Sequence, residues 1–291
     1  MIKGLSFCVG IVVSDSDDPK FLQNSLDSIL SQTQTPDQIV VLTNGKLKDA
    51  LTSRINRFIE ESKVEVALIT QSEQKNFGPN LNTLLNFTNC DYFIRQDPDD
   101  ISLPTRFKLV SDFAFSNVFD VLFTNSINLD CLSPLRLSAP HIYNQNKTLL
   151  TNLIRVNPIV HSSVILNVKS IKGIGGYRDI SKYEDYDLWL RAAKYKLIFA
   201  YLPKKTVIYL NLDTVSKRKD EIRFISESLI TFSKIKLSPV SIISILFWTF
   251  CRIILSYFPK NFLQLLNSKY RSIPLSKDEV DIYASYVKKF S

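Results

Sequence analysis

The stretch YFIRQDPDDISLP, residues 92–104, organises the rest of the chain. In it an apolar run is followed directly by three carboxylates within four residues, those of Asp97, Asp99 and Asp100. Carboxylates this close together repel one another and raise one another's pKa, unless water or a cation lies between them. Carboxylate oxygens suit Mg²⁺ or Mn²⁺, and Mg²⁺ is commonly held by one or two carboxylates together with substrate phosphates. The stretch therefore indicates either a metal–diphosphate site or a solvated acidic turn around Pro98.

Strand and helix patterns alternate through the first part of the chain. Apolar runs rich in β-branched residues predict strands at 5–13, 38–43, 64–70 and 90–96, and helical spacing of apolar residues predicts helices between them. Asp18 is placed to cap the first of these helices, which is expected to begin at Pro19. This alternation is typical of βαβ units and a parallel sheet.

Ligands of parallel sheets bind beyond the carboxyl ends of the strands. The loops at 14–18, 43–46 and 97–100 each follow a predicted strand, so we expect them on one edge of the sheet. This placement favours a binding site over a solvated turn for the acidic cluster. Further along, the pattern predicts a helix at 105–117 and a strand at 119–129.

Composition indicates a globular protein with an uneven charge. The chain has 291 residues, of which 45% are hydrophobic, and this allows a sizeable core. Four cysteines without a CxxC pair fit reduced thiols, and the start of the chain lacks the pattern of a signal peptide, so we expect a cytoplasmic protein. Residues 1–200 hold 21 Lys and Arg against 21 Asp and Glu, whereas residues 201–291 hold 15 against 7. The second part therefore carries the net charge of +8 and is expected to contact an anionic surface.

The stretch YEDYDLWLR, residues 183–191, predicts the start of a helix with acidic residues in its first turn. The helix dipole favours negative charge there, so these acids fit a purely structural role. A carboxylate near a second carboxylate and aromatic side chains can also keep a raised pKa and act as a general base. The residues alone leave both interpretations open. The glycine turn at 173–177 is a weak phosphate-binding signal, because no lysine follows it.

Residues 239–258 are apolar apart from serine, threonine and Arg252. A charge near the middle argues against a membrane span, which needs ~20 apolar residues. Basic residues beside an aromatic and aliphatic face suit a helix that lies in the interface of an anionic bilayer, and a helix buried against the rest of the chain is the alternative. The tail lacks the basic–aromatic repeat of RNA-binding proteins, so we expect no nucleic-acid partner.

Taken in order, several stretches resemble bacterial family 2 glycosyltransferases of the GT-A fold, which act in surface-polysaccharide assembly. They are SLDSILSQTQTPDQIVVLTNG (25–45), NFGPNLNTLL (76–85), IRQDPDDISLPTRF (94–107), NPIVHSSVIL (157–166), GIGGYR (173–178) and EDYDLWLR (184–191). The resemblance covers residues 5–210 and depends more on order and spacing than on any single motif. It implies a Rossmann-like α/β fold with a mixed, mostly parallel sheet flanked by helices.

The resemblance implies a donor side built around the acidic cluster. Asp99 matches the aspartate that binds a divalent metal, Mn²⁺ or Mg²⁺, on the diphosphate of a nucleotide sugar, and Asp97 matches the one that approaches the metal, the ribose and the diphosphate. Asp100 is expected to orient the water shell of the metal, and Arg106 to contact phosphate. The second strand ends in Asn44 where the family carries an acidic pair that reads the base. Asn44 still offers a base edge both a donor and an acceptor.

On the acceptor side, Asp185 matches the catalytic base of the family, which deprotonates the acceptor hydroxyl. Attack from the face opposite the leaving diphosphate inverts the anomeric carbon, and no covalent intermediate is needed. Glu184, Tyr186 and Trp189 are expected to line the acceptor side. The alternative for the two aromatic residues is a place in the core of the helix packing.

These inferences predict a catalytic domain over residues 1–212, with a nucleotide-binding half at 1–104 and an acceptor half at 105–212, followed by a basic, apolar helical extension at 213–291. We expect an inverting glycosyltransferase that moves a sugar from a nucleotide-diphosphate sugar to a lipid-linked saccharide. It would act at the inner face of the cytoplasmic membrane, in contact with anionic lipid through the C-terminal helices. The alternatives are a nucleotidylyltransferase, which shares the sheet and the acidic site, and a non-catalytic nucleotide- or glycan-binding module.

Overall fold

The structure is a computed structural model, and it describes most of the first 211 residues and parts of the tail. The described residues are 4–130, 137–140, 153, 157, 159–180, 183–211 and 272–289, with single positions at 243, 246, 247, 250, 251, 254, 257 and 258. The predicted tail helix at 239–258 therefore lies mostly outside the described residues. The same holds for much of the extension predicted at 213–291.

Strands and helices alternate through the first part of the chain, as predicted. Helix α1 begins at Pro19, and the carboxylate of Asp18 accepts the backbone N–H groups of Lys20 and Phe21. The capping role predicted for Asp18 is therefore confirmed. The elements are β1 (Phe7–Ser14), α1 (Pro19–Leu30), β2 (Gln38–Asn44), α2 (Asp49–Glu61), β3 (Val66–Gln71), α3 (Phe77–Phe87) and β4 (Tyr92–Gln96).

Four of these strands lie in parallel, in the order β4-β1-β2-β3. Ser14 of β1 is level with Asn44 of β2, and Ile11 of β1 is level with Gln96 of β4. The loops that follow these strands therefore leave from one edge of the sheet, as the sequence predicts. Because β4 is paired directly with β1, the acidic loop at 97–100 lies beside the loop that follows β1.

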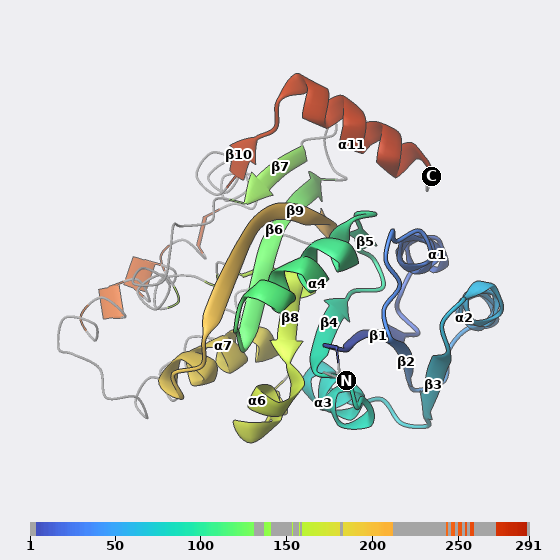
Figure 1. The fold of residues 1–291 in the computed structure, drawn as a ribbon, viewed down its shortest axis with the longest axis horizontal. Coiled ribbons are helices and arrows are strands. Elements are labelled where there is room, and N and C mark those ends of the chain that lie inside the picture. The colour runs from blue at the N-terminus through green and yellow to red at the C-terminus, as the bar shows by residue number, and fades with distance from the viewer. Residues whose placement is uncertain are drawn as a thin grey trace.

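The second half adds strands that reverse direction. Strand β8 pairs antiparallel with β4 and β6, whereas the long strand β9 runs parallel to β6 and antiparallel to the short β5. The result is the predicted mixed α/β sheet flanked by helices (Figure 1), in the order β10-β7-β6-β8-β4-β1-β2-β3, with β9 joined to β6 and β5. The elements are β5 (Ile101–Ser102), α4 (Arg106–Ser116), β6 (Val121–Asp130), β7 (Leu137–Pro140), η1 (His161–Ser163), β8 (Val164–Asn167), α6 (Val168–Gly173), α7 (Glu184–Lys194), β9 (Phe199–Asn211), β10 (Ser272–Pro274) and α11 (Lys277–Lys289).

Helices cover both faces of the sheet, and the alternation of side chains along the strands divides the core in two. Helices α1, α2 and α4 pack against strand residues such as Val9 and Ile11 on one face. Helices α3, α6 and α7 pack against residues such as Val12 and Phe93 on the other face. Burial of each large apolar side chain contributes about 1.5–3 kcal/mol, so these two layers give the edge loops a rigid base.

The described end of the chain packs onto the rest of the molecule. Strand β10 pairs antiparallel with β7, and Val280 of α11 packs beside Ile101 and Ile208. Lys205 of β9 forms an ion pair with Glu279 of α11. Figure 1 shows α11, in red, next to β10 and β7. The boundary expected at residue 212 stays a prediction, but this end of the extension belongs to the same packed body.

Large apolar side chains are exposed at the described tail positions between 243 and 258. Between 44% and 67% of each of these residues is exposed: Ile243, Leu246, Phe247, Phe250, Ile254, Tyr257 and Phe258. Within the part of the chain that the structure describes, no helix has the length and apolar character needed to cross a membrane.

Candidate active site

Gln96, the last residue of β4, builds the loop that carries the acidic cluster. Its buried amide makes five hydrogen bonds. The amide nitrogen donates to the carbonyls of Asp97 and Asp100 at 3.2 and 2.7 Å and to the hydroxyl of Ser25 at 2.9 Å. The amide oxygen accepts from the hydroxyl of Ser102 at 2.6 Å. Ser25 also donates to the carbonyl of Asp97 at 2.6 Å, so helix α1 fixes the start of the loop.

Arg106 of α4 lies beneath this loop without exposed surface. Its guanidinium donates to the side chains of Gln96 and Ser102 at 3.0 and 2.9 Å. It also donates to the carbonyls of Arg95 and Ser162 at 2.8 and 2.6 Å. Burial lowers the pKa of Arg106 to about 9. In this structure Arg106 supports the loop from inside the protein through its two terminal nitrogens. The phosphate contact expected from the resemblance stays a prediction.

Asp97 and Asp99 have different surroundings. Asp97 forms an ion pair with the buried guanidinium of Arg95. Asp99 is half-buried, and burial together with the charge of Asp97 raises its pKa to about 6. Asp17, in the loop after β1, adds to that rise, and burial raises the pKa of Asp17 itself. Three carboxylates from two loops therefore share one neighbourhood, and a bound cation would relieve their repulsion.

The acidic start of α7 forms the second half of the site. Asp185 accepts a hydrogen bond of 2.7 Å from the side chain of Asn157. Burial raises the pKa of Asp185, although its hydrogen bonds and the charge of Arg95 oppose the rise. Burial and the neighbouring Asp185 raise the pKa of Glu184 to about 7. Carboxyl groups with a raised pKa are suited to accept a proton near neutral pH.

The two aromatic residues of α7 lie in the core. Tyr186 and Trp189 have almost no exposed surface, and the hydroxyl of Tyr186 donates to the carbonyl of Leu153. The ring of Trp189 meets the ring of His161 edge-on, with centroids 6.0 Å apart. This burial fits the core alternative for Tyr186 and Trp189. Their expected acceptor-side roles stay predictions. Glu184, at 9% exposed, lies at the boundary between core and surface.

The two acidic groups meet around Arg95. Its positive charge opposes the rise in the pKa of Asp99 on one side and of Glu184 and Asp185 on the other. Tyr209 of β9 lies within electrostatic reach of both groups, because burial, the acidic loop and Asp185 all raise its pKa. Arg95 and Tyr209 thus both interact electrostatically with Asp99 and with Asp185.

The donor set fits a hard divalent cation that a substrate helps to bind. Asp97 and Asp99 offer carboxylate oxygens, which Mg²⁺ and Mn²⁺ prefer. Among the described residues, no three His, Cys, Asp or Glu side chains are grouped so that they could hold an ion by themselves. One or two carboxylates are sufficient when diphosphate oxygens complete the coordination, so these residues fit a metal that is shared with the donor.

Comparison with known proteins assigns the chain to a family. Residues 8–150 match the model of glycosyl transferase family 2. The chain belongs to this family. It is therefore a glycosyltransferase, and the resemblance drawn from its motifs is confirmed.

Two relatives and one solved structure show how far the similarity extends. The glycosyltransferase is 28% identical over 188 residues to UDP-Gal:alpha-D-GlcNAc-diphosphoundecaprenol beta-1,3-galactosyltransferase of Escherichia coli, covering 64% of this chain and 67% of that enzyme. It is 26% identical over 215 residues to the amylovoran biosynthesis glycosyltransferase AmsE of Erwinia amylovora, covering 73% and 79%. The crystal structure of S. aureus TarS has a TM-score of 0.62 at 13% identity, covering 88% of this chain and 44% of TarS. This last likeness shows the fold alone, and the chain spans less than half of TarS.

Asn44 of the glycosyltransferase holds the segment that leads into α3. Its side-chain oxygen accepts from the backbone N–H of Lys75 at 2.8 Å, and its nitrogen donates to the carbonyl of Lys75 at 3.0 Å. The base contact expected for Asn44 stays a prediction, because each end of an amide has a second hydrogen-bonding position.

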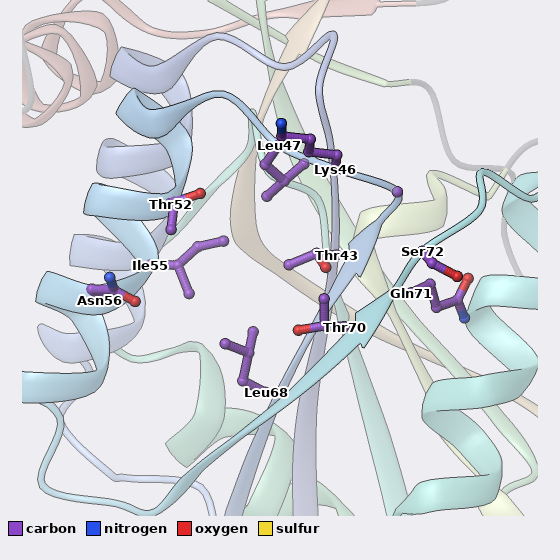
Figure 2. A pocket seen from close by; sticks show the side chains of 11 residues that line it. Thr43, Lys46, Leu47, Thr52, Ile55, Asn56, Leu68, Thr70, Gln71 and Ser72 are labelled. Carbon is purple, nitrogen blue, oxygen red and sulfur yellow. The ribbon is translucent and has the colours of Figure 1, made fainter.

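A hollow beside β3 lies apart from the acidic residues. It has a volume of about 420 Å³ and is bounded by α2 and by β2 and β3, with Ile55, Leu68 and Thr70 among its lining (Figure 2). Thr43 also lines it and shares a sheet face with Val41, which packs on the side of α1 and α2. The hollow therefore opens on the face opposite α3 and α7, and the residues around Arg95 do not line it.

The sequence interpretation missed five residues of this site: Asp17, Arg95, Gln96, Asn157 and Tyr209. Arg95 and Asp97 stand two residues apart, and the period of a strand places such a pair on one face, so this spacing is a usable signal. The contact of Asn157 with Asp185 and that of Gln96 with Ser25 join segments that are far apart along the chain. No local pattern marks them.

Proposed function

We propose that this glycosyltransferase transfers a sugar, with inversion, from a nucleotide-diphosphate sugar to a lipid-linked saccharide in surface-polysaccharide biosynthesis. The name of the E. coli relative specifies an acceptor on diphosphoundecaprenol, and that of the Erwinia relative specifies amylovoran biosynthesis. The observation that carries the proposal is the meeting of two acidic groups, the loop after β4 and the start of α7, around the buried charge of Arg95.

Asp185 is the proposed general base. It takes the proton of the acceptor hydroxyl while that oxygen forms a bond to the anomeric carbon. On the opposite face of the sugar the bond from this carbon to the diphosphate oxygen breaks, and its electron pair leaves with the diphosphate. The configuration therefore inverts. The hydrogen bond from Asn157 orients the Asp185 carboxylate for this step.

The loop after β4 would hold the leaving group. Asp99 would bind a divalent metal, with Asp97 beside it and towards the ribose. When bound, the metal offsets the charge that grows on the diphosphate. Gln96 and Arg106 fix the backbone of this loop, so the two carboxylates are in place before the donor arrives.

A donor screen followed by one substitution tests this proposal. Nucleotide sugars are supplied with Mn²⁺ or Mg²⁺, and release of nucleoside diphosphate identifies the donor. With that donor, Asp185→Asn is expected to lower the transfer rate by about 10²–10⁴-fold while donor binding is kept. Asp112→Asn, on the exposed side of α4, is the matched control and should keep the wild-type rate. Wild-type transfer by Asp185→Asn would reject the base assignment.

We further propose that the enzyme acts at the inner face of the cytoplasmic membrane, which it contacts through its tail. Exposed apolar side chains recur three or four residues apart at positions that include Ile243, Leu246, Phe250 and Ile254. Residues 201–291 also carry more basic than acidic side chains. An apolar helix face beside basic residues suits the surface of an anionic bilayer.

Flotation with vesicles of anionic phospholipid tests the membrane contact. The double variant Leu246→Asp with Phe250→Asp is expected to stay at the bottom of the gradient while the wild type floats. Val118→Asp is the control, because Val118 is an equally apolar and exposed residue just after α4. The proposal is wrong if the wild type fails to float, or if the tail variant floats as well as the wild type.

A further inference from the structure

Arg95 is buried at the point where the two acidic groups meet. Only 1% of the residue is exposed. One guanidinium nitrogen pairs with the Asp97 carboxylate, and another donates to the carbonyl of Gln96 at 2.7 Å. The guanidinium carbon lies 4.7 Å from the centre of the Phe77 ring. These three contacts fix the position of the charge beneath the acidic loop.

The stability of the fold does not explain why an arginine is buried at position 95. Taking an ion out of water costs several kcal/mol, and a buried ion pair is often no more stable than an apolar replacement. The Nε atom of Arg95 has no hydrogen-bond partner among the described residues, and an unsatisfied buried donor costs about 1–3 kcal/mol more. The Nε atom of the neighbouring Arg106 also lacks a partner among the described residues, but Arg106 makes four hydrogen bonds that join α4 to the loop and to η1. The position of Arg95 is better explained by what its charge does for its neighbours.

Ring contacts lead from Arg95 to helix α7. Phe77, which lies against the guanidinium, meets His161 edge-on with centroids 6.3 Å apart. His161 meets Trp189 of α7 in the same way at 6.0 Å, and its Nε2 lies 2.9 Å from the hydroxyl of Tyr177. The packing that fixes Arg95 is thus continuous with the packing of the helix that carries the second acidic group.

Building on the transfer proposed above, we propose that Arg95 is a positioning residue for both halves of the site. It orients the Asp97 carboxylate on the donor side, and it supplies the positive charge that faces Glu184 and Asp185 on the acceptor side. That charge favours the ionised form of these two acids. A carboxyl group must be ionised before it can accept a proton as a base. The charge of Arg95 also offsets the repulsion between the loop and the helix.

The other charged and titratable groups around the α7 carboxylates come from several elements. Arg178 and Arg191 both pair with Asp187 of α7. Arg106 is a further cation within the described part of the chain, and its two terminal nitrogens make the four hydrogen bonds given above. His161 is held neutral, because burial and then Arg95 lower its pKa well below the ordinary value. The remaining groups are Asp17 after β1, Asp97, Asp99 and Asp100 after β4, Tyr177 before α7 and Tyr209 on β9.

Two substitutions separate the charge of Arg95 from its packing. Arg95→Met should move the acid limb of the pH–kcat profile to higher pH by at least about half a unit, because losing a nearby positive charge raises the pKa of both acids. Arg95→Lys keeps the charge, so its acid limb should lie close to that of the wild type. Arg178→Met is the matched control, because Arg178 is an exposed arginine that pairs with Asp187 of helix α7 at 3.0 Å. It should leave the limb in place.

A second readout does not depend on activity. The free energy of unfolding, measured without metal between about pH 8 and pH 5, should rise on acidification, because Glu184, whose pKa burial raises to about 7, binds a proton more tightly in the folded state. Arg95→Met should steepen this rise, and Arg95→Lys should resemble the wild type. Arg95→Gln takes the place of the methionine variant if circular dichroism shows that Arg95→Met does not fold.

Two outcomes would overturn the proposal. In the first, the charge-free variant has a lower kcat but an unchanged acid limb and an unchanged pH–stability curve, which would leave Arg95 with a packing role only. In the second, the shifts appear but Arg95→Lys does not reverse them. A wild type that transfers no sugar from any donor would contradict the proposed function instead, and the pH–stability curves would still test Arg95 by themselves.

Discussion

Replacing Gln96 with leucine tests whether one buried amide holds the acidic loop. The two side chains are similar in size, so the change removes hydrogen bonds with little change in packing. Five hydrogen bonds are lost, one of them to the charged Arg106. At about 1 kcal/mol for each neutral bond and about 1.5–3 kcal/mol for the charged one, the gross loss is about 5–7 kcal/mol.

The net loss should be smaller than this gross figure. Ser25 and Ser102 keep other hydrogen bonds, to the carbonyl of Asp97 and to Arg106, after the amide is gone. The new leucine also adds apolar burial. We therefore expect the free energy of unfolding to fall by about 3–5 kcal/mol, which a domain with the usual 5–15 kcal/mol of stability survives.

Urea unfolding followed by tryptophan fluorescence measures this loss, and Gln71→Leu is the matched control. Gln71 ends β3 as Gln96 ends β4, but its side-chain oxygen has no hydrogen-bond partner among the described residues, so we expect a change within about 1 kcal/mol. Gln96→Leu should also need more Mn²⁺ or Mg²⁺ for half-maximal transfer, because its loop is less well held. Equal losses in the two variants would refute this reasoning and assign the order of the loop to Arg106 and Ser25.

Three further predictions follow from single features of the structure. Asp18→Ala removes the cap of α1 and should cost about 1 kcal/mol in urea unfolding; an unchanged midpoint would contradict the cap. Gly176→Ala should cost at least about 2 kcal/mol by calorimetry, because its φ of +61° is left-handed and a Cβ would lie 2.3 Å from Asn82 Oδ1; a wild-type melting temperature would contradict the clash. Without metal, the melting temperature should rise as pH falls from about 7.5 to about 5.5, because burial raises the pKa of Glu184 to about 7 and of Asp99 to about 6, so both bind protons more tightly when folded. A fall over this window would contradict the raised values.

The parallel half of the fold can be predicted from the sequence because its signals are local. Apolar runs mark the strands, and the pair Asp18-Pro19 marks a helix start that needs no distant partner to be recognised. Strand β5 is different. Two residues give no pattern, and Ile101 and Ser102 are extended because they pair with Ile208 and Val207 far along the chain.

The candidate site can be predicted only in part, for a related reason. The acidic residues stand out because buried carboxylates need a partner, whatever the fold. The places of Tyr186 and Trp189 do not stand out, because α7 is buried along most of its length and so has no polar face by which to tell inside from outside. Arg106 is similar: an arginine near a helix start can point to solvent or into the protein, and its buried acceptors come from three separate segments.

The pairing of β5 with β9 also bears on how the enzyme is made. Ile101 is paired with Ile208 in the antiparallel ladder, and the N–H of Leu103 donates to the carbonyl of Thr206 at 2.8 Å. A nascent chain leaves the ribosome from its N-terminus, so the four parallel strands can assemble before β9 has been translated. At that stage β5, which follows the loop of Asp99, has no partner strand. A polypeptide released early, before residues 206–208, would contain the four parallel strands without the partner that β5 needs at the end of the acidic loop.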